Sequence, residues 1–203
     1  MGGSVRLSKR ELRRQLLAER RRRGPGETSS ISVAVCARVL SLSAFRESTH
    51  VVTYAARADE LDPSELVEAA RAAGKFVYFP RIVGSRLEFL ESVPQDLRPG
   101  EWGVLEPGSG RPLDLGAPET LFLVPGLAFD PTTGGRLGRG GGHYDRALAD
   151  HPSGLRLGLA AEASLLPGLP SDPWDQPMDG VVTEDRLLWL GGRLRSAFKE
   201  NLT

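Results

Sequence analysis

Hydrophobic side chains recur every three to four residues near the start of the chain. Leu12 and Leu16 follow Ser8, which with Glu11 forms a capping box, so a helix is predicted from about residue 8 to residue 23. The Gly24-Pro25-Gly26 run would end that helix. A second helix is expected after it, with Ser29 or Ser30 as its cap.

Farther along, short apolar or alternating runs predict strands at 50–56, 75–79, 86–91, 120–124, 155–160 and 181–183. Helices are predicted from Asp62-Pro63 to Gly74, with Glu65 completing a capping box, and from Tyr144 to Asp150. Segments 92–119 and 167–177 are rich in proline and expected to be loops. Strands that alternate with helices favour an α/β fold of three layers: a mostly parallel, Rossmann-like sheet with helices on both faces, in a single domain over residues 1–203.

Charge changes this picture at the N-terminus. The 203 residues carry 26 basic and 26 acidic side chains, so the total gives no reason to expect a nucleic-acid or membrane partner. Residues 1–23, however, hold nine basic groups against two acidic ones, a local charge of +7 that leaves −7 on the remainder. A basic helix on an acidic body can hold an anion between the two. Arg20–Arg23 are interpreted as a solvated basic face.

The single cysteine, Cys36, cannot form an internal disulfide, which favours a reducing compartment. No apolar stretch approaches the ~18 residues of a membrane helix, and no apolar segment follows the charged start as in a secretory signal. We therefore expect a cytoplasmic protein without a membrane or nucleic-acid partner, and a monomer.

The richest local signal is a glycine-rich segment before the helix near Tyr144. Six glycines fall between residues 134 and 142, with Arg136 and Arg139 among them; we call residues 134–142 the glycine loop. Glycines let backbone N–H groups converge on an anion, a helix N-terminus adds a positive dipole end, and guanidinium groups bind phosphate oxygens. The loop matches neither the Walker A motif nor the dinucleotide fingerprint. Phosphate binding is the favoured interpretation, with a flexible surface loop as the alternative.

The sequence RLGRGGGHYDRAL at 136–148 resembles the RLGxGxGYYDR signature of 5-formyltetrahydrofolate cyclo-ligases. Weaker similarities occur in the right order: KRELR at 9–13, RADEL at 57–61, WGVLEP at 102–107, PGLAFD at 125–130, and residues 170–175 with Asp179 and Thr183-Glu184. These matches span almost the whole chain, and the central one is specific by itself. One departure is His143, where the family has a tyrosine; the ring is kept and its chemistry changes.

The resemblance implies a Mg²⁺- and ATP-dependent ligase of one-carbon metabolism. It would cyclise 5-formyltetrahydrofolate to 5,10-methenyltetrahydrofolate through a phosphorylated formyl intermediate, releasing ADP and phosphate. Motif positions imply Mg²⁺ ligands at Asp145 and Asp175. The implied ATP contacts are Lys9, Arg10, Arg13, Arg136, Leu137, Gly138, Arg139, Gly140, Gly141, Gly142, His143 and Tyr144. The folate site would hold Arg13, Ala55, Glu60 and Tyr144, and Trp102 is a further candidate that would either stack on the substrate or pack in the core.

Phosphoryl transfer depends mainly on positioning and on charge stabilisation. Arg139, between two glycines, is therefore the candidate for stabilising the transferred group, and Tyr144 is the second catalytic candidate. Arg136 is expected to hold another phosphate, and Lys9 and Arg13, one helical turn apart, to clamp one anion together. For Asp145 the alternative is a plain helix-dipole partner, and for Asp175 a turn residue.

Two other functions remain open from the residues alone. A kinase or a phosphosugar-handling enzyme could use the same loop on a similar sheet. A nucleic-acid-binding module could use the basic N-terminal helix, but the charge of −7 on the remaining residues weighs against it.

Overall fold

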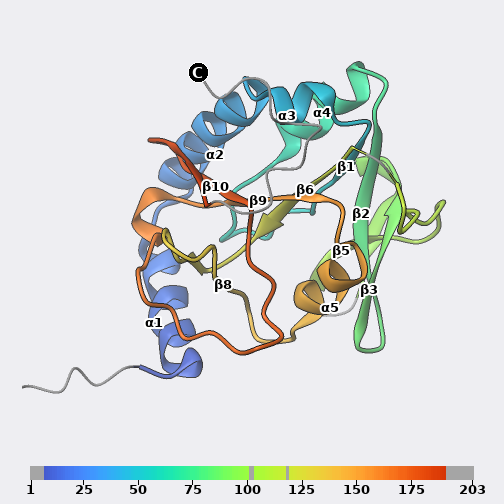
Figure 1. Cartoon of the computed structure of the whole chain (residues 1–203). Helices are drawn as coiled ribbons and strands as arrows, with labels where there is room; N and C mark the ends of the chain where they lie inside the picture. The colour runs from blue at the N-terminus through green and yellow to red at the C-terminus, as the bar shows by residue number, and fades with distance from the viewer. Residues whose placement is uncertain (1–6, 101–102, 118, 191–203) are drawn as a thin grey trace, which may run out of the picture.

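A seven-stranded sheet forms the centre of the computed structural model, which describes residues 7–100, 103–117 and 119–190 (Figure 1). The spatial order of the strands is β11-β10-β9-β6-β1-β2-β3. The inner five pair in parallel, whereas β3 and β11 are antiparallel edges. Their bounds are β1 His50–Val52, β2 Phe76–Val83, β3 Arg86–Glu91, β6 Thr120–Pro125, β9 Leu155–Leu159, β10 Gly180–Val182 and β11 Leu187–Trp189.

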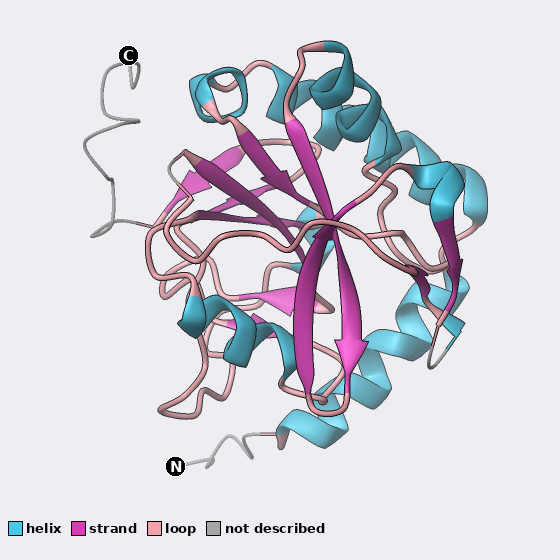
Figure 2. Cartoon of the chain, turned by 90° about the vertical axis from the view of Figure 1, so that its right-hand side faces the viewer, coloured by secondary structure: helices cyan, strands magenta, loops and turns pink. Residues whose placement is uncertain are grey.

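Helices cover both faces of this sheet, as Figure 2 shows with the β2–β3 hairpin in front. One face carries α2 (Pro25–Leu40), α3 (Ser43–Glu47) and α4 (Ser64–Ala72), and the other carries α5 (His143–Asp150). Neighbouring strand residues point to opposite faces. Thus Val51 and Leu121 belong to the core under α2 and α4, while Val52 and Phe122 belong to the core under α5. The predicted three-layer α/β class is confirmed; a single domain over all of 1–203 stays a prediction.

The long helix α1 (Lys9–Arg22) packs away from both main cores. Its buried Leu16 contacts a third apolar cluster with Leu127, Ala128 and Leu137. The latter residues belong to the hairpin of β7 (Ala128–Phe129) and β8 (Arg136–Leu137) or precede it directly. The capping box of Ser8 and Glu11 forms as predicted. Hydrophobic contact therefore fixes α1 beside the first part of the glycine loop.

One predicted helix start and one predicted capping box were wrong. α2 begins at Pro25 with Gly24 as its N-cap, before Ser29 and Ser30, because proline is well suited to the first helical position. α4 has Pro63 as its N-cap and no side-chain capping bond, so the predicted capping box with Glu65 does not form. Asp62 instead accepts hydrogen bonds from the backbone N–H and hydroxyl of Ser64.

The predicted strands were correct in place, and all but β1 and β2 end within one residue of the predicted bounds. β1 covers only the first three residues of the predicted strand 50–56, because the chain leaves the sheet after Val52. The predicted loop 92–119 contains a 3₁₀ turn at Pro94–Asp96 and a small sheet of β4 (Leu97–Pro99) with β5 (Leu105–Pro107). β11 and α3 were not predicted; both are short, with three and five residues.

The strand order reverses at the centre of the sheet. Counted along the chain, the five parallel strands are arranged 2-1-3-4-5, with the reversal between β1 and β6. Ligands of open α/β sheets bind where such a reversal opens a crevice at the carboxyl ends of the strands. We call this side of the sheet the carboxyl edge.

Candidate active site

The chain segments that follow β1 and β6 form the floor of the carboxyl edge. After β1, the buried Tyr54 donates a hydrogen bond to Leu61 O at 2.8 Å, which closes the loop between them. Burial raises the pKa of Tyr54 well above its ordinary value, so its hydroxyl stays protonated. Residues 57–60 lie inside this closed loop and carry two carboxylates, Asp59 and Glu60.

The last residues of the glycine loop have a backbone that favours glycine. Gly140 has φ of +110° and Gly142 has φ of +64°, both in the left-handed region. A Cβ on Gly140 would lie 3.4 Å from the Arg13 guanidinium carbon, so α1 approaches the loop closely. Arg13 Nε donates to Gly138 O at 2.9 Å. Gly142 is the N-cap of α5 and supplies no side-chain cap, which suits a helix N-terminus that faces a ligand.

Arg136 and Asp145 form a nearly buried ion pair behind this loop. Arg136 Nη2 lies 3.2 Å from each carboxylate oxygen of Asp145, and the two side chains are 6% and 15% exposed. The guanidinium also lies over the Tyr144 ring at 5.3 Å. Burial raises the pKa of Tyr144, so this residue is a neutral hydrogen-bonding ring.

Arg139 extends from the glycine loop to the loop after β1. Its Nη2 donates to both oxygens of Asp59, at 2.6 and 2.8 Å, and its Nε donates to Glu60 Oε1 at 3.1 Å. The sequence separation of about 80 residues is spanned by two loops that meet at the strand reversal. The structure therefore brings together Arg139 and Glu60, which were assigned separately to phosphate and folate.

Lys9 holds the loop before β10. Its Nζ lies 2.7 Å from Asp172 and 2.5 Å from Asp175. Burial lowers the pKa of Lys9, but the two carboxylates outweigh it and the net shift is upward. Burial likewise raises the pKa of Asp175, and the Lys9 hydrogen bond reverses this to a net decrease. Next to Asp175, the backbone N–H of Gln176 donates to Asp145 Oδ1 at 3.3 Å, so the two predicted metal ligands lie on touching segments.

The remaining residues predicted for the site have different surroundings. His143 Nδ1 is 3.2 Å from Ser85 O in the β2–β3 turn, where Arg146 also donates. The Leu137 side chain is buried in the third cluster, so it supports the loop from below. Ala55 packs against the core under α2 and α4. Arg10 is exposed. Trp102 lies outside the described residues.

Arg20 contacts the candidate site, although its sequence position did not predict this. It was interpreted as solvated, yet its Nη2 donates to Gly126 O and its Nη1 to Asp59 O at 3.4 Å. Burial lowers its pKa. Arg20 ties α1 to the segments after both β1 and β6. Its position seven residues after Arg13, two helical turns along the same face, is the one sequence feature that sets it apart from Arg21 and Arg22, and it becomes informative only once the packing of α1 is known.

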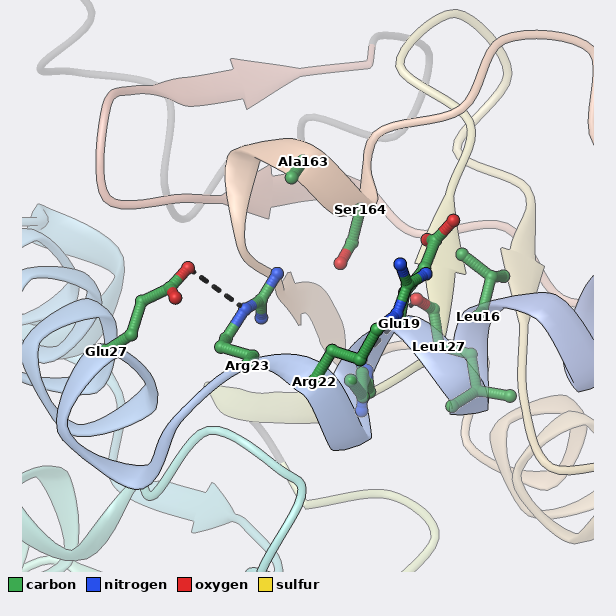
Figure 3. Close-up of a pocket in the computed structure, with 9 residues that line it drawn as sticks. Leu16, Glu19, Arg22, Arg23, Glu27, Leu127, Ala163 and Ser164 are labelled. Atoms are coloured by element: carbon green, nitrogen blue, oxygen red, sulfur yellow. Dashed lines mark hydrogen bonds and ion pairs between the residues drawn. The ribbon is translucent and has the colours of Figure 1, made fainter.

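A cavity of about 340 Å³, lined in part by Arg20, lies where α1 ends and α2 begins. Figure 3 shows this cavity. Arg22, Arg23, Glu27 and Ser164 help to line it, and Arg23 pairs with Glu27 at 3.5 Å. No glycine-loop residue lines this cavity. Although Arg20 lines this cavity, Lys9, Arg13, Arg136 and Arg139 do not. We therefore place the candidate active site at the carboxyl edge and not in this cavity.

This arrangement of loops is typical of an α/β enzyme that binds a phosphate-bearing ligand next to a second, polar substrate. The model of the 5-formyltetrahydrofolate cyclo-ligase family matches residues 5–184. The chain therefore belongs to the 5-formyltetrahydrofolate cyclo-ligase family and is a ligase.

Relatives and solved structures agree. A 5-formyltetrahydrofolate cyclo-ligase of Mus musculus is 26% identical over 197 residues, covering 90% of this chain and 96% of the relative. One from Escherichia coli K12 is 36% identical over 136 residues, covering 63% and 74%. The NMR structure of Aquifex aeolicus 5,10-methenyltetrahydrofolate synthetase superposes with a TM-score of 0.80 at 32% identity, covering 92% and 95%. A Mycoplasma pneumoniae synthetase, at 19% identity and a TM-score of 0.71, shares the fold.

Proposed function

We propose that the carboxyl edge binds ATP and 5-formyltetrahydrofolate, and that the family's reaction takes place there. The observation that carries this proposal is the meeting of Arg139 with Asp59 and Glu60 where β1 and β6 diverge. Phosphate-binding groups on the glycine loop and polar groups on the loop after β1 lie in direct contact, so two substrates bound to them would be adjacent.

The reaction needs few covalent steps from the protein. The formyl oxygen attacks the γ-phosphorus of ATP and ADP leaves; N10 then attacks the activated formyl carbon, and phosphate leaves as the ring closes. Arg139 would stabilise charge on the transferred group, and Arg136, Arg13 and Lys9 would hold the other phosphates. Arg10 and the backbone from Leu137 through His143 would complete the ATP site. Tyr144 and Glu60, with Ala55 and Trp102, would orient the folate.

Asp145 and Asp175 are the residues that would hold Mg²⁺. The described residues contain no cluster of three or more His, Cys, Asp or Glu side chains that could hold a metal. Mg²⁺ fits nonetheless, because it takes one or two carboxylates and completes its shell with phosphate oxygens and water. When bound, the ion would neutralise charge on the phosphates. The two carboxylates are also restrained, by Arg136 and Lys9.

We further propose that the protein is a cytoplasmic monomer. Within the described residues, no helix has the length and hydrophobicity to cross a membrane. Cys36 is buried and unpaired with another cysteine, as a reducing compartment allows.

The decisive experiment mixes the purified protein with Mg-ATP and 5-formyltetrahydrofolate and follows the near-ultraviolet absorption of the methenyl product. We expect the band to grow only when ATP is present, with one ADP formed per product. ADP formation without the band would favour the kinase alternative. Oligonucleotide binding that weakens steeply with salt would instead favour the nucleic-acid alternative.

A further inference from the structure

We infer that Asp59 is a positioning residue for Arg139, holding one edge of its guanidinium so that the other edge faces the phosphates. Asp59 lies in the RADEL segment at 57–61, but the resemblance gave it no role and pointed only to its neighbour Glu60. The inference rests on the proposed role of Arg139 in phosphoryl transfer.

The contact has the geometry of a strong charge-assisted pair. Arg139 Nη2 lies 2.6 and 2.8 Å from the two Asp59 oxygens, shorter than the 3.1 Å from Nε to Glu60. The Arg139 and Asp59 side chains are 34% and 25% exposed. Charge-assisted hydrogen bonds of this length are about twice as strong as neutral ones. Asp59 therefore makes the closer of the two carboxylate contacts.

These contacts leave part of the guanidinium available. An arginine side chain has five N–H donors in a planar fork. Asp59 and Glu60 use donors on Nε and Nη2, and among the described residues no hydrogen bond involves Nη1 of Arg139. A phosphate oxygen can therefore bind Nη1 while both carboxylates keep their places. The ion pair does not have to break before ATP binds.

The backbone on the Arg139 side cannot fix the side chain alone. Arg139 lies between Gly138 and Gly140, and glycine neighbours leave the chain many conformations. A free arginine side chain also loses rotamer entropy when it is immobilised. A charge that stabilises a transition state is effective when it is already in place. A carboxylate that holds the guanidinium before the reaction meets this requirement.

The Asp59 side of the contact is rigid by comparison. Arg57 O accepts from the backbone N–H of Glu60 at 2.9 Å, and the N–H of Arg57 donates to Glu60 Oε2 at 3.2 Å. The carbonyl of Asp59 itself accepts from Arg20 Nη1 at 3.4 Å. The turn at 57–60 is thus closed from within and tied to α1. Asp59 therefore projects from a restrained backbone and can hold Arg139 in one position.

The first test compares Asp59→Asn with Asp62→Asn. Both remove one charge from the loop after β1, but the Asp62 carboxylate accepts hydrogen bonds from Ser64, and the variant keeps an amide oxygen to accept them. We expect Asp59→Asn to lower kcat about 10- to 100-fold, in line with the cost of misplaced catalytic groups. The KM for folate, the calorimetric affinity for ATP and the thermal midpoint should stay near wild type. Asp62→Asn should leave kcat unchanged.

A double-mutant cycle separates positioning from a general effect of the charge. In an Arg139→Ala background, Asp59→Asn should cause no further loss of kcat, because the group that it positions is gone. Equal losses in both backgrounds would overturn the inference, as would an unchanged kcat in the single variant. Faster turnover or tighter ATP binding in Asp59→Asn would also overturn the inference, since the ion pair would then keep Arg139 from the phosphates. Wild-type protein that forms no methenyl product would refute the proposed function instead.

Discussion

Several cationic side chains at the carboxyl edge are held by oxygens from distant parts of the sequence. Arg139 contacts residues about 80 positions away, and Lys9 contacts residues more than 160 positions away. Such contacts hold long side chains in one arrangement before ligands arrive, and preorganised charge is the main contribution that proteins make to phosphoryl transfer. The individual residue therefore acts through the partner that orients it.

Replacing Arg139 tests whether a preorganised cation contributes to the rate. Arg139→Ala should reduce kcat by about 10²–10³, the usual cost of removing one preorganised donor. ATP should still bind, because Arg136, Arg13 and the loop backbone remain. Steady-state rates and calorimetry with ATP measure the two effects. Unchanged turnover would exclude the catalytic role, and lost ATP affinity would make Arg139 a binding residue.

The buried thiol of Cys36 gives an independent check on the core. Its side chain is 1% exposed, and burial raises its pKa to about 12. Since the thiolate is the reactive form, a thiol reagent at pH 8 should modify the folded protein more than about 100-fold more slowly than the protein in denaturant. Rapid modification without loss of the far-ultraviolet dichroism of the fold would show that α2 does not pack as described.

The sequence motif pointed to the proposed site residues and not to all of the residues that contact them. Arg136, Arg139 and Asp145 could be found because a specific motif carries them. Arg20 could not be distinguished from Arg21 and Arg22 by composition, since only the packing of α1 decides which arginine of a basic run turns inward. Asp59 was missed for the same reason: its partner is set by the meeting of two loops.

The helix α1 acts as a clamp along the carboxyl edge. Its apolar side packs on the β7–β8 hairpin through Leu16, and its cations reach three different segments. Lys9 and Arg13 contact separate loops, so the expected clamp on one anion would need both loops to close around the ligand.

Removing both cations should weaken ATP binding without unfolding the helix. We expect Lys9→Ala with Arg13→Ala to lose at least about tenfold in ATP affinity, since each charge-assisted contact contributes about 1.5–3 kcal/mol. The matched control is Arg14→Ala with Arg21→Ala, two exposed positions of the same helix. Calorimetry with ATP and the thermal midpoint distinguish the variants. Equal ATP affinity in both double variants would show that Lys9 and Arg13 do not bind ATP and have only a structural role.

Asp130 shows how a motif residue can be structural. Its Oδ2 accepts from the backbone N–H groups of Gly168 and Leu169, at 2.7 and 3.2 Å, and Oδ1 accepts from Thr132 and Thr133. Burial raises the pKa of Asp130, but these hydrogen bonds outweigh it and the net shift is downward. The side chain is 2% exposed. Asp130 thus joins the start of the glycine loop to the loop after β9.

A carboxylate with a lowered pKa stabilises the fold only while it is charged. Its contribution is present above the ordinary pKa of about 3.9 and is lost as the pH falls through the lower value in the folded protein. Asp130→Asn, which replaces an acceptor with a donor, should cost about 1–3 kcal/mol at pH 7 and progressively less below about pH 4. Urea unfolding of both proteins between pH 3 and pH 7 measures this. A pH-independent difference, or a similar one for the exposed Asp114→Asn, would contradict it.

The elements of the fold were predictable where a buried apolar run is long enough. β6 and β9 are buried along almost their whole length, and each was placed within one residue of its ends. Strands β4, β5 and β11 have three residues each, too few for a pattern, and they form because a partner strand lies beside them. Strand order and the reversal between β1 and β6 also depend on contacts that no local pattern contains.

Over the whole molecule, opposite charges are matched within the site itself. The sequence separates a basic start from an acidic remainder, and folding brings them together in the Lys9–Asp175 pair. The Arg136–Asp145 pair forms within the remainder. Each pair joins a proposed phosphate-binding cation to a proposed Mg²⁺ ligand. ATP binding alone would leave Asp145 without its cation, and Mg²⁺ binding alone would leave Arg136 without its anion. An unpaired charge is costly at 6% and 15% exposure, so the two ligands should bind together.

The prediction is that Mg²⁺ and ATP raise the thermal midpoint together by more than the sum of their separate effects. A ligand that binds the folded state stabilises it by RT ln(1 + [L]/Kd), so the midpoint reports coupling without any turnover. Chelation of Mg²⁺ by ATP in solution also produces some coupling, and Asp145→Asn controls for it. In that variant chelation is unchanged, whereas Arg136 no longer has a carboxylate to lose. ATP alone should therefore stabilise Asp145→Asn more than it stabilises wild type, and added Mg²⁺ should contribute less. The same Mg²⁺ dependence in both proteins would mean that Asp145 partners only Arg136 and takes no part in metal binding.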